Sequence, residues 1–278
     1  MFKKLINKAV PRLYGFYFNA LSLISKEKGA ALAMRVFSVP RSGKILPYQH
    51  EFLSTSHQQK LITEEGFIQI YHWKGNGKTI FLAHGWESNA WRWKFLIEPL
   101  LQRNYNIIAI DAPAHGNSDG TEFTAIKYSR IIRKVVELYQ PEIIVAHSVG
   151  AMATSFQESE TPHDFLEKLV LLGSPNTLQV IMKNYQNLVG FTNRVYGSLD
   201  DLLDQTYGFK INDFSTEDFV SKISCPVLLI HSKEDAIVSF DSVNQIALKS
   251  PNATVYESKT GGHSLHTPEV VDQILAFL

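Results

Sequence analysis

The chain has 278 residues, 45% of them hydrophobic and 19% charged, and its formal net charge is zero. This composition is typical of a folded globular protein, and the neutral charge gives no support to nucleic-acid binding. The single cysteine, Cys225, excludes an internal disulfide and a structural zinc site built from cysteines, and it is compatible with the cytoplasmic location that we expect.

Residues 1–58 are predicted to form a basic, amphipathic helical extension. Residues 1–60 hold ten lysines and arginines against two acidic residues, Glu27 and Glu51. Apolar residues recur at helical spacing within this segment, and they are Leu13, Phe16, Tyr17, Ala20, Leu21 and Ile24.

Three interpretations of this helix stay open. It packs on the main body as an accessory helix, it contacts a membrane surface or a partner, or it is a signal peptide or anchor. The second interpretation rests on the basic residues that flank the apolar stripe, which are Lys3, Lys4, Lys8 and Arg12. The apolar run is interrupted by Asn19 and Ser22 and is too short to span a bilayer. We expect the accessory helix.

Residues 59–278 are predicted to form an α/β domain, because short β-rich runs alternate there with helical patterns. The predicted strands are 60–63, 67–73, 79–85, 106–113, 142–148, 168–174, 226–232 and 253–258. The predicted helices lie near 91–103, 123–139, 149–159 and 240–249, with a last one from Thr267 to the end. Several strands are continuously apolar, which is typical of a parallel sheet covered on both faces. We therefore expect a mostly parallel, eight-stranded sheet with helices on both faces, and an antiparallel hairpin of the first two strands at one edge.

One interval, about 178–222, interrupts this alternation. It has no convincing strand and holds seven aromatic residues, which are Tyr185, Phe191, Tyr196, Tyr207, Phe209, Phe214 and Phe219. An insertion between two strands of a sheet often covers the site, so we predict a small helical cap. Its rings, with Trp91 and Trp93, are compatible with an apolar substrate group, but packing of the cap onto the body is the stronger explanation for most of them.

Ligands of parallel α/β sheets bind outside the carboxyl ends of the strands, so the residues that follow each apolar run are the candidates. The stretch "AHSVG" (146–150) ends one run and begins a helix. Ser148 is either a nucleophile on a sharp turn, for which Ala146 and Gly150 are small enough, or a serine that caps the following helix. His147 is interpreted as a neighbour without a role.

The stretch "HGW" (84–86) follows another apolar run. Gly85 permits close approach of the backbone, so the amides of Trp86 and Val149 are the candidates for an oxyanion hole. His84 is interpreted as a residue that orients this loop.

An acid and a base follow two later strands. Asp235 comes three residues after the run that ends near Ser232, with Glu234 as the alternative acid. His263 directly follows a pair of glycines before the last helix, with His266 as the alternative base.

The order Ser148, Asp235, His263 resembles that of the α/β-hydrolase superfamily over residues 60–278. The stretch "DAPAHGNSDG" (111–120) is similar to the family's D-x-x-G-H-G-x-S loop, with Ala114 in place of a glycine; Asp111 and His115 are expected to brace the site. Together, "HGW", "DAPAHG" and "AHSVG" resemble a group of little-characterised bacterial hydrolases.

The resemblance implies a serine hydrolase that cleaves a small-molecule ester or thioester through an acyl-enzyme. His263 would act as base, Asp235 would orient it, and neither a metal nor an organic cofactor would be needed. Two alternatives stay open: carbon–carbon bond hydrolysis or acyl transfer with the same residues, and a non-catalytic ligand receptor on this fold. The oligomeric state is not predicted.

Overall fold

The computed structural model describes the backbone of residues 2–278, with side chains from residue 9 on. The chain forms two compact units. Unit 1 combines the residues up to 39 with residues 177–215, and unit 2 combines residues 40–176 with 216–278. Each unit is therefore built from two stretches that are distant in the sequence.

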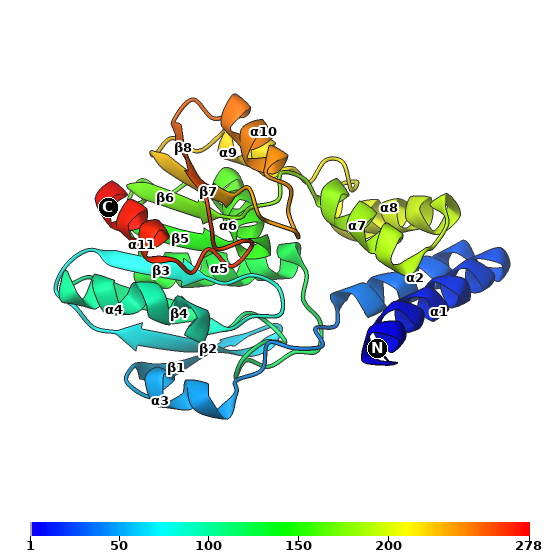
Figure 1. The fold of residues 1–278 in the computed structure, drawn as a ribbon, viewed down its shortest axis with the longest axis horizontal. Coiled ribbons are helices and arrows are strands. Elements are labelled where there is room, and N and C mark those ends of the chain that lie inside the picture. The colour runs from blue at the N-terminus through cyan, green and yellow to red at the C-terminus, as the bar shows by residue number, and fades with distance from the viewer. Residues whose placement is uncertain (1) are drawn as a thin grey trace. The chain divides into compact units, whose positions relative to one another are not determined.

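Unit 2 is organised around one eight-stranded sheet with the strand order β1-β2-β4-β3-β5-β6-β7-β8 (Figure 1). The strands are β1 (His57–Thr63), β2 (Gly66–Trp73), β3 (Thr79–Ala83), β4 (Asn106–Ile110), β5 (Ile143–His147), β6 (Lys168–Leu172), β7 (Val227–Ser232) and β8 (Ala253–Ser258). Strand β2 pairs antiparallel with β1 and β4, and the remaining neighbours are parallel. The predicted mostly parallel sheet and its edge hairpin are thus confirmed.

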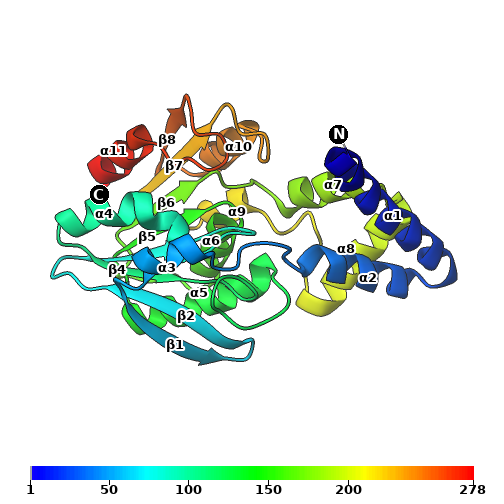
Figure 2. The same ribbon diagram turned by 60° about the horizontal axis from the view of Figure 1, so that its bottom comes forward.

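Helices cover both faces of this sheet (Figure 2). Helices α4 (Lys94–Gln102) and α11 (Pro268–Phe277) pack together on one face. The other face carries α5 (Ala125–Tyr139), α6 (Val149–Glu160), α9 (Thr216–Val220) and α10 (Asp241–Lys249), where α6 packs on α5 and α9 packs on both α6 and α10. Three short elements precede β1 or α4: η1 (Pro47–Gln49), α3 (His50–Leu53) and η2 (Ala90–Trp93). The central strands β5 and β7 are buried at every residue, which explains why each begins with four consecutive apolar residues.

Unit 1 consists of four helices, α1 (Phe2–Ile24), α2 (Lys26–Ser38), α7 (Leu178–Val189) and α8 (Asn193–Tyr207). Helix α1 contacts the other three, and α2 packs on α8. The sequence predicts a separate extension at 1–58 and a cap at about 178–222. In the structure, the first 39 residues and the inserted residues instead share one unit, while η1, α3 and α9 belong to unit 2.

The apolar stripe that predicted α1 is not the face that packs. Gly15, Phe18 and Ser22 are buried, whereas Phe16 is 75% and Ile24 85% exposed. Gly15 is needed for this packing, because a Cβ there would lie 2.1 Å from the backbone oxygen of Val189 in α7. The helix therefore packs on its neighbours through Phe18 together with the small residues Gly15 and Ser22. Lys3, Lys4 and Lys8 lie outside the described side chains.

None of the helices in the described part of the chain is both long enough and apolar enough to cross a bilayer.

Candidate active site

Ser148 lies on the sharp turn between β5 and α6, with a φ of 54° and a ψ of −126°. Such a positive φ is strained for a residue with a side chain and recurs at functional sites. The serine side chain makes no capping hydrogen bond to α6. The alternative interpretation, a serine that caps the helix, therefore does not describe this residue.

Close packing against the end of β3 explains the small residues around Ser148. A Cβ at Gly150 would lie 2.3 Å from the backbone oxygen of His84 and 2.8 Å from that of Ala83. A larger residue there would push the turn away from β3. Ala146 is completely buried and pairs with Ala83 in the sheet, so alanine is accommodated where the related motif has its first glycine.

A chain of two hydrogen bonds connects Ser148, His263 and Asp235. The Ser148 hydroxyl donates to His263 Nε2 at 3.0 Å, and His263 Nδ1–H donates to Asp235 Oδ2 at 2.7 Å. This assignment of the imidazole proton follows from the carboxylate, which only accepts hydrogen bonds. The three residues follow β5, β7 and β8, so the topology of the sheet brings them to one edge.

Asp235 is held as an ionised acceptor. Its side chain is completely buried, and its Oδ1 accepts the amides of Ile237 at 2.8 Å and Val238 at 2.9 Å. Its Oδ2 also lies 3.2 Å from Nε2 of the buried His231. Burial opposes ionisation, but the hydrogen bonds from His231, His263 and the backbone outweigh it and hold the pKa of this carboxyl below its usual value.

The loop that carries His263 is strained and is held by two buried side chains. Gly261, Gly262 and Leu265 all have positive φ angles. His147 Nε2–H donates to the backbone oxygen of His263 at 2.8 Å, and an Arg92 Nη2–H donates to that of Ser264 at 3.0 Å. His147, which was expected to have no role, therefore contacts the loop that carries the candidate base.

Arg92 carries its guanidinium into the interior. The residue is only 7% exposed, its Nη2 also donates to His266 Nε2 at 3.1 Å, and its guanidinium lies 4.8 Å from the ring centre of Trp93. Nη1 has no hydrogen-bond partner among the described residues. Burial lowers the pKa of Arg92 to about 9. Burial and this cation lower the pKa of His266 to about 3, so His266 stays neutral, and its Nε2 accepts a hydrogen bond from the arginine instead of facing the serine.

The loop after β3 lies directly against Ser148. A Cβ at Gly85 would be 2.8 Å from Ser148 Cβ, so only glycine allows the backbone to come this close. The ring of Trp86 packs edge-on against Phe123, with ring centres 5.4 Å apart. Val149 begins α6, where the first amides of a helix have no intrahelical acceptor.

Asp111 ties together the loops behind the candidate site. It is completely buried, with Oδ1 accepting the Ala90 amide and Oδ2 accepting the Asn117 amide and the Tyr71 hydroxyl, each at 2.8 Å. A Cβ at Gly116 would collide with this carboxylate, which explains the glycine of the "DAPAHG" stretch. Asp111 is therefore held away from Ser148 by its own partners.

Two neutral histidines complete this bracing. His84 Nε2 accepts the Ala112 amide and His115 Nε2 accepts the Glu87 amide, both at 2.9 Å. Burial lowers the pKa of His84 well below its usual value and that of His115 to about 4. Both rings therefore act as uncharged acceptors that connect the loops after β3 and β4.

The sequence predicted the residues that form the hydrogen-bonded chain, and it missed those that hold them. The structure brings Ser148, Asp235 and His263 together, while His266 faces Arg92. The missed residues are Arg92, His147 and His231. Arg92 lies one helical turn before Leu96 on the buried face of the η2–α4 segment. A positively charged residue at an apolar position of a helical pattern is therefore the feature of the sequence that could have indicated it.

Comparisons with known proteins are consistent with this geometry. A model described as the alpha/beta hydrolase family matches residues 80–274. The chain is 24% identical over 262 residues to YugF, an uncharacterised hydrolase of Bacillus subtilis, covering 75% of this chain and 93% of that protein. It is 25% identical over 213 residues to a bifunctional esterase/perhydrolase of Acinetobacter calcoaceticus, covering 58% of this chain and 76% of that protein. Among solved structures, the esterase Pf2001 of Pyrococcus furiosus has the same fold, with a TM-score of 0.62 at 20% identity over 87% of this chain and 95% of that one.

Proposed function

Because the chain belongs to the alpha/beta hydrolase family, we propose that it is a serine hydrolase that cleaves a small-molecule carboxylic ester or thioester. The observation that carries the proposal is the hydrogen-bonded chain from the Ser148 hydroxyl through His263 to Asp235. A serine hydroxyl is a weak nucleophile unless an adjacent base takes its proton, and His263 Nε2 lies 3.0 Å away to do so.

In this mechanism Ser148 Oγ attacks the carbonyl carbon of the substrate while His263 takes the hydroxyl proton. Asp235 holds the imidazole in the correct tautomer and stabilises the imidazolium that forms. The imidazolium then protonates the leaving alcohol or thiol, and the acyl group stays on Ser148. A water molecule, deprotonated by His263, hydrolyses the acyl-enzyme and restores the free serine.

The tetrahedral oxyanion needs donors close to Ser148. We propose the amides of Trp86 and Val149 for this role, because Gly85 brings the first loop against the serine and Val149 is the first residue of α6. The dipole of α6 adds to the stabilisation of negative charge at its N-terminus. Oxyanion donors are typically worth about 10²–10³-fold each in rate.

A fluorophosphonate probe tests the nucleophile directly. Wild-type protein is expected to be labelled on Ser148, and Ser148→Ala is expected to abolish labelling, because the probe reacts only with an activated serine. Ser155→Ala is the matched control, since Ser155 is also buried on α6 but donates to the backbone of its own helix. Folded wild-type protein that stays unlabelled would contradict the proposal and favour a receptor without activity.

The base is tested by comparing two histidines. His263→Ala is expected to lower kcat for a p-nitrophenyl ester by about 10⁴-fold or more, while His266→Ala is expected to retain most of the activity. The reverse result would assign the base to His266. A panel of p-nitrophenyl esters of increasing acyl length, an acyl thioester and a vinylogous diketone then separates ester, thioester and carbon–carbon bond hydrolysis.

A further inference from the structure

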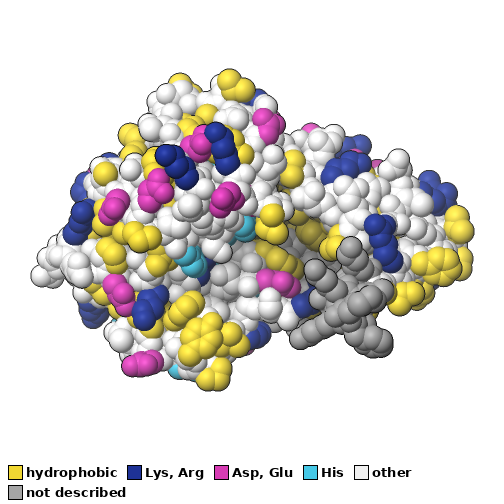
Figure 3. All heavy atoms as spheres, viewed as in Figure 1, with side chains coloured by type: hydrophobic (Ala, Val, Ile, Leu, Met, Phe, Trp, Pro, Cys, Tyr) yellow, Lys and Arg dark blue, Asp and Glu magenta, His cyan; other side chains and the backbone are white. Residues whose placement is uncertain are grey.

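The outer face of α1 exposes large apolar side chains along its described length. Phe16 and Leu23 are each 75% exposed and Ile24 is 85% exposed. Val10, Leu13 and Tyr17 are also exposed on this helix. In Figure 3, hydrophobic side chains gather over the end of α1, next to lysine and arginine side chains. A run of exposed apolar residues of this kind is unusual for a free surface and indicates a binding face.

Basic residues outnumber acidic residues in the sequence of α1 and of the residues directly after it. The sequence has no acidic residue before Glu27. The basic residues within α1 or directly after it are Lys3, Lys4, Lys8, Arg12, Lys26 and Lys28, and the one acidic residue in the same stretch is Glu27. Basic residues at both ends of an apolar and aromatic stripe are typical of a helix that lies in the headgroup region of a membrane.

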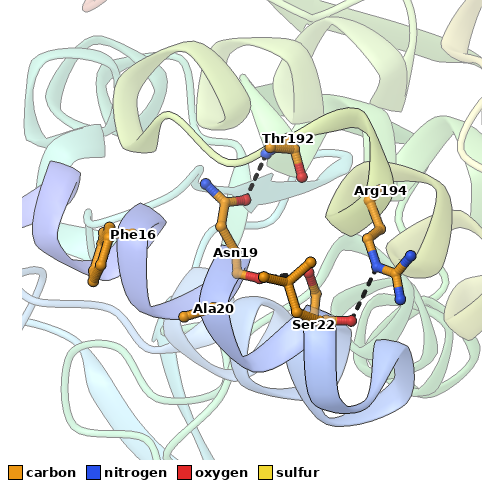
Figure 4. A pocket seen from close by; sticks show the side chains of 7 residues that line it. Phe16, Asn19, Ala20, Ser22, Thr192 and Arg194 are labelled. Atoms are coloured by element: carbon orange, nitrogen blue, oxygen red, sulfur yellow. Dashed lines mark hydrogen bonds between the residues drawn. The ribbon is translucent and has the colours of Figure 1, made fainter.

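A shallow groove of about 500 Å³ lies beside the exposed face, within unit 1 (Figure 4). The side chains that line it are Phe16, Asn19, Ala20, Ser22, Leu23, Thr192 and Arg194. Asn19 and Arg194 fix its walls, because Asn19 Oδ1 accepts the Thr192 amide at 2.8 Å and Arg194 Nε donates to the Ser22 backbone oxygen at 3.0 Å. An apolar groove with an arginine at its rim can accept a hydrocarbon chain that ends in an anionic group.

We propose that the outer face of α1 docks on the surface of an anionic lipid bilayer, with the helix in the plane of the headgroups. Phe16, Leu23 and Ile24 would enter the boundary of the acyl chains, while the basic residues contact lipid phosphates and carboxylates. A second copy of the chain is a poorer occupant, because it would place two basic helices against each other. An anionic bilayer matches both features, because its acyl chains take up the apolar stripe and its headgroups attract the excess of basic residues.

Vesicle sedimentation of the full chain tests this proposal. Vesicles of phosphatidylcholine with about a third phosphatidylserine are expected to bind the protein at least ten-fold more strongly than vesicles of phosphatidylcholine alone. Raising the salt concentration to about 0.5 M is expected to weaken this binding, because the charges lie at the surface and are screened. Equal binding to both vesicle types, or none to either, would overturn the proposal.

Substitutions on α1 test which residues enter the bilayer. Phe16→Ser with Leu23→Ser is expected to lower binding by about ten-fold or more, because two of the exposed apolar side chains are lost. The matched control is Ile62→Ser with Leu248→Ser on unit 2, whose side chains are 77% and 79% exposed. Circular dichroism verifies that both double variants fold. An equal loss of binding in the two double variants would overturn the assignment to α1.

A fluorescent label reports insertion independently of affinity. Cys225 is the only cysteine and is 9% exposed, so Leu23→Cys offers one accessible thiol for an environment-sensitive dye. The dye at position 23 is expected to shift to the blue with anionic vesicles, whereas the same dye on Leu248→Cys is expected to keep its spectrum. Absence of a shift at position 23, together with a dimer in analytical ultracentrifugation that Phe16→Ser dissociates, would instead assign the face to a second copy.

Discussion

Arg92 is placed to position the candidate base without touching a substrate. Its Nη2 donates to the Ser264 backbone oxygen, next to His263 in sequence, and to His266. The loop also contains Leu265 with a positive φ, so its conformation depends on such contacts. A displacement of the imidazole by about 1 Å is enough to lower a catalytic rate substantially.

We therefore expect Arg92→Met to lower kcat by about 10- to 100-fold with little change in KM, because the loop that carries His263 loses a hydrogen bond. Arg92→Lys is expected to recover part of the activity, since an ammonium can still donate to Ser264. Arg133→Met, at an exposed arginine, serves as control. Steady-state kinetics across pH is the measurement. A variant that loses thermal stability but keeps the wild-type kcat and pH profile would limit Arg92 to a structural role.

At the scale of single elements, two glycines of unit 1 differ in what a side chain would meet. A Cβ at Gly15 would lie 2.1 Å from the Val189 backbone oxygen, whereas a Cβ at Gly197 in α8 would meet nothing within 4 Å. Gly15→Ala is expected to destabilise unit 1 by forcing α1 away from α7. Gly197→Ala is expected to stabilise it by about 0.5–1 kcal/mol through helix propensity. Hydrogen exchange of the amides in α1 and α7 measures both effects, and a neutral Gly15→Ala would contradict this packing.

The central strands of unit 2 could be predicted because burial on both faces leaves each of them a continuous apolar run, whereas the edge strands β1 and β8 are largely exposed. The ends of those runs then indicated Ser148, Asp235 and His263. The packing of α1 could not be predicted in this way, because hydrophobic periodicity follows the large side chains, whereas the buried side of this helix combines Phe18 with the small residues Gly15 and Ser22. Arg92 was missed for a related reason, since a charged residue on an apolar face does not contribute to that pattern.

At the scale of the whole molecule, buried neutral histidines couple the stability of unit 2 to pH. Burial lowers the pKa of His115 to about 4, against about 6.5 in an unfolded chain. Between these values the unfolded state binds a proton that the folded state does not, so the free energy of unfolding falls as pH falls. His115 alone accounts for about 3 kcal/mol when pH drops from above 6.5 to 4. His84 and His147 act in the same direction.

Urea unfolding at pH 7.5 and pH 5 measures this dependence. We expect a lower free energy of unfolding at pH 5, and a smaller decrease for His115→Gln, which removes one of the titrating groups. His57→Gln, at an exposed histidine, is expected to keep the wild-type decrease. The four tryptophans are at positions 73, 86, 91 and 93, so their fluorescence follows unit 2 alone. A wild-type stability that does not change between the two pH values would contradict the burial of neutral histidines.

The composition of unit 1 also constrains the order in which the protein can fold during its synthesis. The residues up to 39 share that unit with residues 177–215. The ribosome adds about 140 residues between the two stretches, which at roughly 5–20 residues per second takes on the order of ten seconds. During that time the nascent α1 has α2 but neither α7 nor α8 to pack on, so the surfaces that later contact α7 and α8 are open to chaperones. Completion of unit 1 must therefore wait until most of the sheet has been synthesised.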